Sequence, residues 1–279
     1  MIKRILQAAF LQAKADLRPQ LRGTGILSFI FFPLFFVGLF RYISGPDTTI
    51  VSTAIGAVLA ASMIGGFAAY TSIQLPQEMY IEHLNGTLLR VKFLPFGIPA
   101  WMIGKALSLS FFSLTQTLLF MFASALVLPD FSFSTTQYLL ALLVLLISLV
   151  ANTPIAFLFG TLTRDTWSTA LVYLGMMGLF AISGVALPVA LLPNWLAWFP
   201  YITPGYWGSY LSRAVFLDEQ TRTFFGDVPG YNWLALLVLL VWIVVGFTLA
   251  AFAIRRSFKK ETTSVLISRR HKIDSQLGM

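Results

Sequence analysis

The sequence predicts an all-α polytopic membrane protein with six membrane-spanning helices in a single domain over residues 1–260. Of its 279 residues, 57% are hydrophobic and only 11% are charged, whereas soluble domains carry about 25% charged residues. Long uncharged runs recur along the chain, and roughly 20 apolar residues in a helix cross a membrane core of about 30 Å. Cysteine is absent, which excludes disulfides, cysteine catalysis and cysteine-based zinc sites.

Residues 1–20 predict an amphipathic helix that lies flat on the inner leaflet of the membrane. Apolar residues recur there with helical spacing, at Ile2, Ile5, Leu6, Ala9, Phe10, Ala13 and Leu17. The other side carries Lys3, Arg4, Lys14 and Arg18, as in basic helices that bind a membrane surface. Because charges occur throughout this segment, we expect no cleavable signal peptide.

The six spans are predicted at about residues 23–44, 50–74, 98–128, 137–162, 166–187 and 231–254. The uncharged run from Thr166 to Ser212 is too long for one span, because its 47 residues would form a helix of roughly 70 Å. Prolines would also break such a helix. We therefore predict one span at about 166–187, followed by a broken segment that enters the membrane face and returns and that contains Pro188, Pro193, Pro200 and Pro204.

Lysine and arginine predict that both termini face the cytoplasm. With the N-terminus inside, fifteen of the 19 basic residues lie on the inner side, including those of a basic tail at 255–279. The outer side then holds only Arg41, Arg213 and Arg222, in agreement with the positive-inside rule. The remaining basic residue, Lys105, lies near the inner end of the third span. The tail is expected to contact anionic membrane lipid. No nucleic-acid partner is expected, because basic residues in such a chain report topology and lipid contact first.

The loop at 78–90 interrupts the apolar pattern with a short, charged helical segment. Glu78 and Glu82 are four residues apart and share one helix face. Apolar residues share another face, at Ile81, Leu84 and Leu88. Gly86 ends or bends the helix. Two interpretations stay open: the segment docks on a cytoplasmic partner with basic residues, or it is a solvated loop with a chance acidic pair.

Two stretches resemble the signatures of type-2 ABC exporter permeases. "EMYIEHLNGTLLRVKFLPFGIPAWMIGK", residues 78–105, is similar to the segment in which an acidic pair precedes Gly-Thr-Leu, a basic residue, a proline and Gly-Lys. "ISGVALPVALLPNWLAWFPYITPGYWGSYLSRAVF", residues 182–216, is similar to the second signature, where Leu-Pro-x-Trp-Leu begins a re-entrant helical hairpin. This resemblance implies a re-entrant hairpin at 189–212, which includes Trp195 and Tyr206. Their order and spacing extend the resemblance over almost the whole chain, closest to the drug- and antibiotic-exporting branch.

The resemblance implies a permease subunit of an ATP-driven exporter in the cell membrane. Such permeases work as homodimers or heterodimers with two copies of a separate ABC ATPase, which binds the ATP and Mg. The small pairs Gly56/Ala60 and Ala61/Gly65 would support contact with the second permease. The segment at 78–90 would be the coupling helix, seated in a groove of the ATPase through Glu78, Ile81, Glu82, Leu84, Gly86, Thr87, Leu88 and Arg90.

No nucleotide site is predicted on this chain. In "GIPAWMIGKA", residues 97–106, six residues separate the glycines where a phosphate loop has four, and Ala106 replaces the magnesium-binding Ser or Thr. We therefore expect no catalytic residue, metal site or cofactor on this chain. All eleven acidic residues lie outside the predicted span interiors. This counts against an ion-coupled secondary transporter or a channel, which is the alternative of a different class.

The resemblance implies a substrate path along the first, second and fifth spans, and the aromatic and methionine residues of these spans would make it apolar. The candidates are Phe29, Phe32, Phe36, Met63, Phe67, Tyr70, Met176, Met177 and Phe180. Such a path suits a hydrophobic or amphipathic compound, such as a drug or antibiotic. Two alternatives stay open: these residues face lipid or fill helix interfaces, or the substrate is a polysaccharide or lipid-linked compound.

Overall fold

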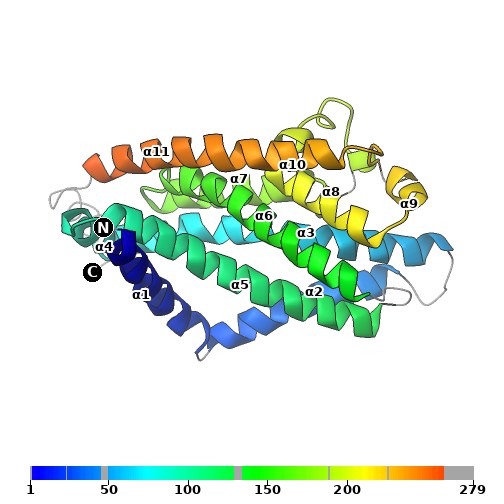
Figure 1. Cartoon of the computed structure of the whole chain (residues 1–279), viewed down its shortest axis with the longest axis horizontal. Helices are drawn as coiled ribbons and strands as arrows, with labels where there is room; N and C mark the ends of the chain where they lie inside the picture. The colour runs from blue at the N-terminus through cyan, green and yellow to red at the C-terminus, as the bar shows by residue number, and fades with distance from the viewer. Residues whose placement is uncertain are drawn as a thin grey trace.

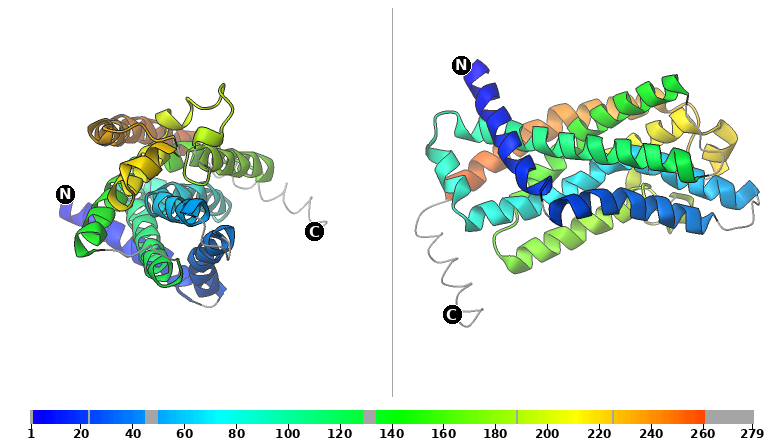
Figure 2. Two further views of the ribbon diagram at one scale, coloured as in Figure 1. Left: turned by 90° about the vertical axis from the view of Figure 1, so that its right-hand side faces the viewer. Right: turned by 90° about the horizontal axis from the view of Figure 1, so that it is seen from below.

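The computed structural model describes residues 2–22, 24–44, 50–128, 134–187, 189–224 and 226–260. Within these ranges every regular element is a helix and no strand occurs. The long helices run along the long axis of an elongated bundle (Figure 1), and Figure 2 shows the same bundle from one end and from below.

The helices follow one another with short connections. In chain order they are α1 (Ile2–Gln20), α2 (Thr24–Ile43), α3 (Ile50–Leu84), α4 (Thr87–Phe93), α5 (Gly97–Val127), α6 (Thr135–Gly160), α7 (Thr166–Ile182), η1 (Val189–Leu191), η2 (Pro200–Ile202), α8 (Pro204–Phe216), α9 (Glu219–Phe224), α10 (Asn232–Val241), η3 (Trp242–Gly246) and α11 (Phe247–Lys260). The elements η1 and η2 are single 3-10 turns, and η3 is a π-helical turn inside the last long helix.

Five helical segments among the described residues are long and apolar enough to cross a membrane. They are Gly25–Ile43, Ile55–Leu84, Gly97–Val127, Thr135–Gly160 and Asn232–Phe258. Helix α7 is also apolar and has 17 residues, which is the lower limit for a span. The predicted all-α membrane fold is therefore confirmed. Six spans were predicted, and the described residues hold five helices of spanning length and the shorter α7.

The two ends of the bundle carry different elements (Figure 1). One end, the α4 end, holds α4, the start of α1 and the end of α11. The opposite end, the α9 end, holds α9 and the C-terminal end of α5. Of the predicted basic tail, Arg255 and Arg256 belong to α11, and residues 261–279 lie outside the described ranges.

Helix α1 packs along the first half of α5. Ala9 and Ala13 are buried, and Gly104 of α5 lies so close to Ala9 and Gln12 that a Cβ atom would contact them. Other residues of the predicted apolar stripe remain exposed, with Ile2 at 72% and Phe10 at 65%. The small residues of the stripe thus contact the protein, and the large residues Ile2 and Phe10 stay exposed.

Helix α3 is longer than the sequence predicts. It continues past the predicted end of the span at residue 74 and through Pro76 to Leu84. Its 35 residues reach about 50 Å at 1.5 Å per residue, well beyond a membrane core of about 30 Å. Gly86 then adopts φ 70°, the left-handed conformation that commonly ends helices at glycine. The segment at 78–90 therefore consists of the end of α3 and the start of α4, separated at Gly86, where the helix was expected to end or bend.

The re-entrant segment also differs from its prediction. The first limb of the predicted helical hairpin consists only of η1, η2 and the turns between them, because Pro193 and Pro200 cannot donate the backbone hydrogen bonds of a continuous helix. The second limb is α8. The Thr203 side chain accepts a hydrogen bond from Tyr206 N and caps it, and Pro204 occupies its first turn. Trp195 is 72% exposed, and Pro188 lies outside the described residues.

Helix α8 packs against α3 in the interior of the bundle. Gly65 and Gly208 bring the two backbones together, and a Cβ atom on Gly65 would collide with the Gly208 carbonyl. The Ser209 hydroxyl donates to the Ser62 carbonyl at 2.8 Å, and the Ser212 hydroxyl donates to the Ala61 carbonyl at 2.6 Å. The expectation that Ala61 and Gly65 contact a second permease is corrected, because α8 of the same chain covers them.

Candidate functional site

The α4 end carries a cluster of four charged side chains, in which one lysine meets three carboxylates. Lys105 Nζ lies 3.1 Å from Asp16 Oδ2 and 2.9 Å from Glu78 Oε2. It lies 2.8 Å from Glu82 Oε1. The lysine side chain is only 4% exposed, and the carboxylate side chains are between 12% and 22% exposed. We call this group the Lys105 cluster.

Neutral side chains complete the Lys105 cluster. Three of them donate hydrogen bonds to its carboxylates: Trp101 Nε1 to Glu82 Oε2 at 2.7 Å, Gln20 Nε2 to Glu78 Oε1 at 3.1 Å, and Gln12 Nε2 to Asp16 Oδ1 at 3.0 Å. These groups belong to α1, α3 and α5. The cluster therefore joins three helices directly beside α4, and a shift of one helix changes the contacts of the other two.

The acidic pair of the predicted coupling segment points into the protein. We expected Glu78 and Glu82 to face basic residues of a partner, but both carboxylates contact Lys105 of the same chain. The expected direction of these two side chains is corrected. The physical reason is that α3 extends as a helix to Leu84, which holds its acidic face against α5. Their role in coupling stays a prediction.

The remaining coupling candidates divide between core and surface. Leu88 is 1% exposed and belongs to a hydrophobic cluster with Leu75 and Met79, so it cannot fill the floor of a partner's groove as expected. Ile81 is 48% exposed. Leu84 and Thr87 are half-buried, and Gly86 is buried in the turn. Arg90 is exposed, and its Nη2 donates to the Asn85 carbonyl at 3.3 Å.

An exposed apolar tip follows α4, which the sequence analysis missed. Phe93 is 78% exposed, Leu94 59% and Phe96 45%, and Pro95 between them is also exposed. Phe96 adopts φ 59°, which is uncommon for a residue other than glycine. The feature of the sequence that could have predicted this tip is the run of four non-polar residues in a loop between two predicted spans. We call residues 93–96 the apolar tip.

The predicted substrate-path residues lie mostly inside the chain. Phe29, Met63, Phe67, Met176 and Phe180 are buried. The others are Phe32, Phe36 and Tyr70, which are partly buried against the core, and Met177, which is 40% exposed. Phe32 stacks on Tyr70 with ring centroids 3.9 Å apart. In this structure the buried members fill helix interfaces, as one of the two open interpretations expected.

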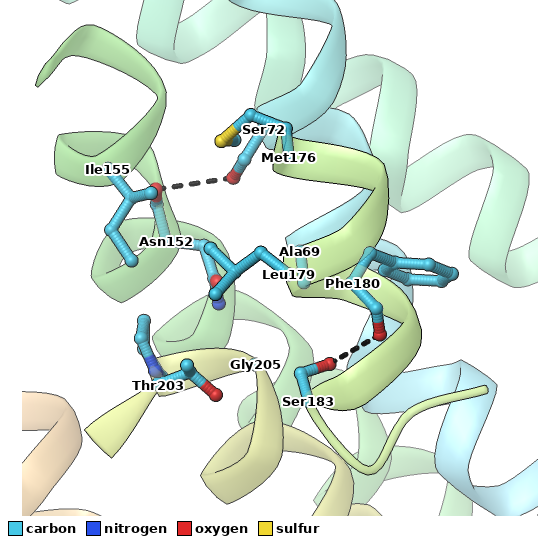
Figure 3. Close-up of a pocket in the computed structure, with 11 residues that line it drawn as sticks. Ala69, Ser72, Asn152, Ile155, Met176, Leu179, Phe180, Ser183, Thr203 and Gly205 are labelled. Atoms are coloured by element: carbon cyan, nitrogen blue, oxygen red, sulfur yellow. Dashed lines mark hydrogen bonds between the residues drawn. The ribbon is translucent and has the colours of Figure 1, made fainter. Parts of the chain in front are cut away.

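A small cavity lies among α3, α6, α7 and the start of α8 (Figure 3). The Ser72 hydroxyl donates to the Asn152 carbonyl at 3.2 Å, and the Ser183 hydroxyl donates to the Phe180 carbonyl at 2.7 Å. The cavity measures about 20 Å³, which is room for about one water molecule. It is too small for a drug-sized compound, so it does not form a substrate chamber.

A second charged cluster lies at the α9 end and is drier than the first. Arg213 donates to Asp227 in a bidentate pair, from Nε to Oδ2 at 2.8 Å and from Nη2 to Oδ1 at 2.7 Å. Arg213 Nη1 also donates to the Ser62 hydroxyl of α3 and to the Gly184 carbonyl. Arg222 Nε lies 3.6 Å from Asp227 Oδ2. The side chains of Arg213 and Asp227 are 5% and 4% exposed.

Asp218 marks the start of α9 beside this cluster. Thr221 donates to it twice, from the backbone nitrogen at 2.9 Å and from the hydroxyl at 2.7 Å. These hydrogen bonds hold the pKa of the exposed Asp218 carboxyl below its usual range. Asp218 therefore acts as a local helix cap, outside the buried cluster.

The apolar bundle, with five to six helices of spanning length, defines a multi-pass membrane protein. Residues 2–217 match the family model described as ABC-2 type transporter, and the chain belongs to this family. It is accordingly a membrane-domain, permease-type chain and not a nucleotide-binding subunit.

A curated plant protein supports the same assignment. The chain is similar to the ABC transporter G family member 38 of Arabidopsis thaliana, with 24% identity over 138 residues. The match covers 45% of this chain and 9% of the relative. The chain therefore spans only a small part of the length of this relative.

Proposed function

We propose that this chain is the permease subunit of an ATP-driven exporter for hydrophobic or amphipathic compounds. Two permeases, identical or homologous, work with two copies of an ABC ATPase, which holds the ATP and Mg. The chain spans the cell membrane with both termini in the cytoplasm. In this proposal the α4 end is the cytoplasmic end.

The Lys105 cluster is the observation that carries this proposal. An ATPase that moves α4 must transmit the motion to spanning helices, and the cluster links α3 and α5 on either side of α4 to α1. Because one ammonium faces three carboxylates, it can exchange partners without becoming unpaired. Glu78 and Glu82 then act in coupling by holding α3 to α5, and not by direct contact with the ATPase.

The apolar tip and the exposed Arg90 form the surface that we assign to the ATPase. Exposed aromatic side chains are typical anchors of protein interfaces. The chain has no cysteine, so Phe93→Cys carries a single thiol for a maleimide–diazirine crosslinker. In native membranes this variant is expected to crosslink to a subunit that hydrolyses ATP.

Leu126→Cys is the matched control for this experiment, because Leu126 is 71% exposed at the other end of α5. It is expected to give no such adduct. Equal adducts from both positions, or a Phe93 adduct with no ATP hydrolysis, contradict the proposed interface.

The substrate path is proposed to form between two permeases. One chain encloses no chamber of sufficient size at the cavity of Figure 3, while Phe32, Phe36, Tyr70 and Met177 reach the surface of α2, α3 and α7. Aromatic and methionine side chains adapt to varied apolar ligands. The substrate class is tested by measuring which compounds stimulate ATP hydrolysis, with panels of hydrophobic drugs, antibiotics, glycans and lipid-linked compounds. A response to glycans or lipid-linked compounds alone favours the polysaccharide or lipid branch.

Ion coupling is the second candidate function, and the Lys105 cluster also favours it. All eleven acidic residues lie outside the predicted span interiors, but the structure brings Asp16, Glu78 and Glu82 together around a single lysine. Carboxylates in such a site can exchange protons or cations. Proteoliposomes that hold the chain alone distinguish the two functions, because only an ion-coupled transporter moves substrate there under an ion gradient without ATP.

A further inference from the structure

An open groove lies between α1 on one side and α5 and α6 on the other. It measures about 690 Å³, and its lining is mostly apolar, with Phe10 and Leu17 from α1, Leu107 and Phe111 from α5, and Leu146 from α6. Several of these side chains are exposed, including Phe111 at 48% and Leu146 at 49%. The shape and lining suit a hydrocarbon chain better than a polar ligand.

Basic side chains line the same groove along α1 and just after it. They are Lys14, Arg18 and Arg22. Among the residues that the structure describes, none of the three forms an ion pair, whereas Asp16 of the same helix contacts Lys105 on α5. The groove therefore combines an apolar interior with uncompensated positive charge, which is complementary to a molecule with a hydrocarbon tail and an anionic head.

The level of the groove in the membrane decides which molecule with a hydrocarbon tail and an anionic head can reach it. In a multi-pass membrane protein, an amphipathic helix beside the spans lies at the level of the lipid headgroups. Basic pockets between helices on the cytoplasmic side bind anionic headgroups. A second protein chain or a transported compound would not require three basic residues at this level.

We propose that the groove between α1 and α5 holds one anionic phospholipid. Its acyl chain lies against Leu107 and Phe111, and its headgroup phosphate is bound by Lys14, Arg18 and Arg22. The bound lipid fills the space beside α1 and supports the position of that helix, from which Asp16 reaches Lys105. This site depends on the membrane placement and not on ATP-driven export, so either proposal can fail alone.

Native mass spectrometry of the detergent-purified full chain tests the site with phosphatidylglycerol and phosphatidylcholine as probes. The wild type is expected to retain one phosphatidylglycerol in preference to phosphatidylcholine. Lys14→Gln/Arg18→Gln should lower the retention of phosphatidylglycerol by roughly 25-fold, since each basic residue near a lipid surface contributes roughly a fivefold increase. Lys3→Gln/Arg4→Gln removes the same charge from α1 outside the groove and should change it by less than about twofold.

A second measurement locates the acyl chain. Phosphatidylglycerol with a diazirine in its acyl chain should label the peptide that contains Leu107 and Phe111, and Ser110→Trp, which fills the groove without changing charge, should suppress this label. The proposal is overturned if the wild type shows no preference for the anionic lipid, if both double variants lose retention equally, or if the label falls outside the groove. A change of oligomeric state in Ser110→Trp with unaltered lipid retention also overturns it, in favour of a second copy.

Discussion

The two charged clusters of this molecule have opposite compositions. At the α4 end, one ammonium faces three carboxylates that are 12% to 22% exposed. At the α9 end, two guanidinium groups face one carboxylate that is 4% exposed. The first cluster therefore has three carboxylates for one cation and some access to water, while the second has a single carboxylate for two cations.

This difference indicates which end of the bundle is fixed and which end can rearrange. A bidentate, buried Arg–carboxylate pair such as Arg213–Asp227 has a strict geometry, and loss of one partner leaves a charge without compensation. A lysine surrounded by several carboxylates can lose one contact and keep the others. We infer that the α9 end acts as a rigid anchor and that the α4 end tolerates displacement of its helices.

Asp227→Ala should have the largest effect, because it leaves Arg213 and Arg222 without their carboxylate in a dry site. Removal of one partner of a buried ion pair costs about 3–5 kcal/mol. We expect loss of the monodisperse peak in detergent and a large drop in unfolding temperature. Gln220→Ala, on the exposed start of α9, serves as control. Equal stability of the two variants would contradict the anchor role.

Lys105→Met should cost less than the loss of Asp227, about 2 kcal/mol, because the three remaining carboxylates have partial access to water. Under the proposed function we also expect ATP hydrolysis by the complex to lose its response to substrate. Thermal unfolding of the purified chain measures the loss of stability, and an unchanged unfolding temperature would argue against the three-carboxylate arrangement.

Glu82→Gln should have a smaller effect, of about 1 kcal/mol or less. The amide oxygen still accepts from Trp101, and Asp16 and Glu78 still compensate Lys105. In a double-mutant cycle with Lys105→Met, the two losses should not add, because both act on one contact. Strict additivity of the measured unfolding free energies would mean that Glu82 and Lys105 do not interact.

Phe93→Ser should change stability least, within about 0.5 kcal/mol, because the side chain is exposed. Under the proposed function it should nevertheless weaken binding of the ATPase. Co-purification of the ATPase, set against the unfolding temperature of the isolated chain, separates the two effects. An unchanged yield of ATPase would exclude Phe93 from the interface and leave the rest of the apolar tip to be tested.

The sequence predicted the fold class well, because hydropathy reports directly on spanning helices. It did not predict the partners of Lys105. Its contacts join residues 16, 78, 82 and 105, and this proximity depends on α1 lying along α5, which no local pattern encodes. The charge count placed the lysine near the inner end of its span, and a charge at the end of an apolar run was the available signal.

The re-entrant segment shows a second limit of local patterns. Leu-Pro-x-Trp-Leu suggested a helical limb by family resemblance, but the structure has only short turns before α8. The second limb followed from its sequence more directly, because Thr203 and Pro204 form a recognisable helix start. Burial of Ser209 and Ser212 against α3 was not predictable, since hydroxyl pairing with distant carbonyls is a property of tertiary packing.

The uninterrupted course of α3 has a mechanical consequence. Ser62 lies at the anchor and Glu82 at the Lys105 cluster, on one helix, about 30 Å apart at 1.5 Å per residue. The backbone contact between Gly65 and Gly208 lies near the anchor, and we infer that it is the point about which α3 tilts. A tilt of α3 by about 10° around that point would displace its far end by about 5 Å, which is close to one helical turn. The acidic pair, Glu78 and Glu82, lies near the end of α3 that is farther from this point, so it would move most when the helix tilts.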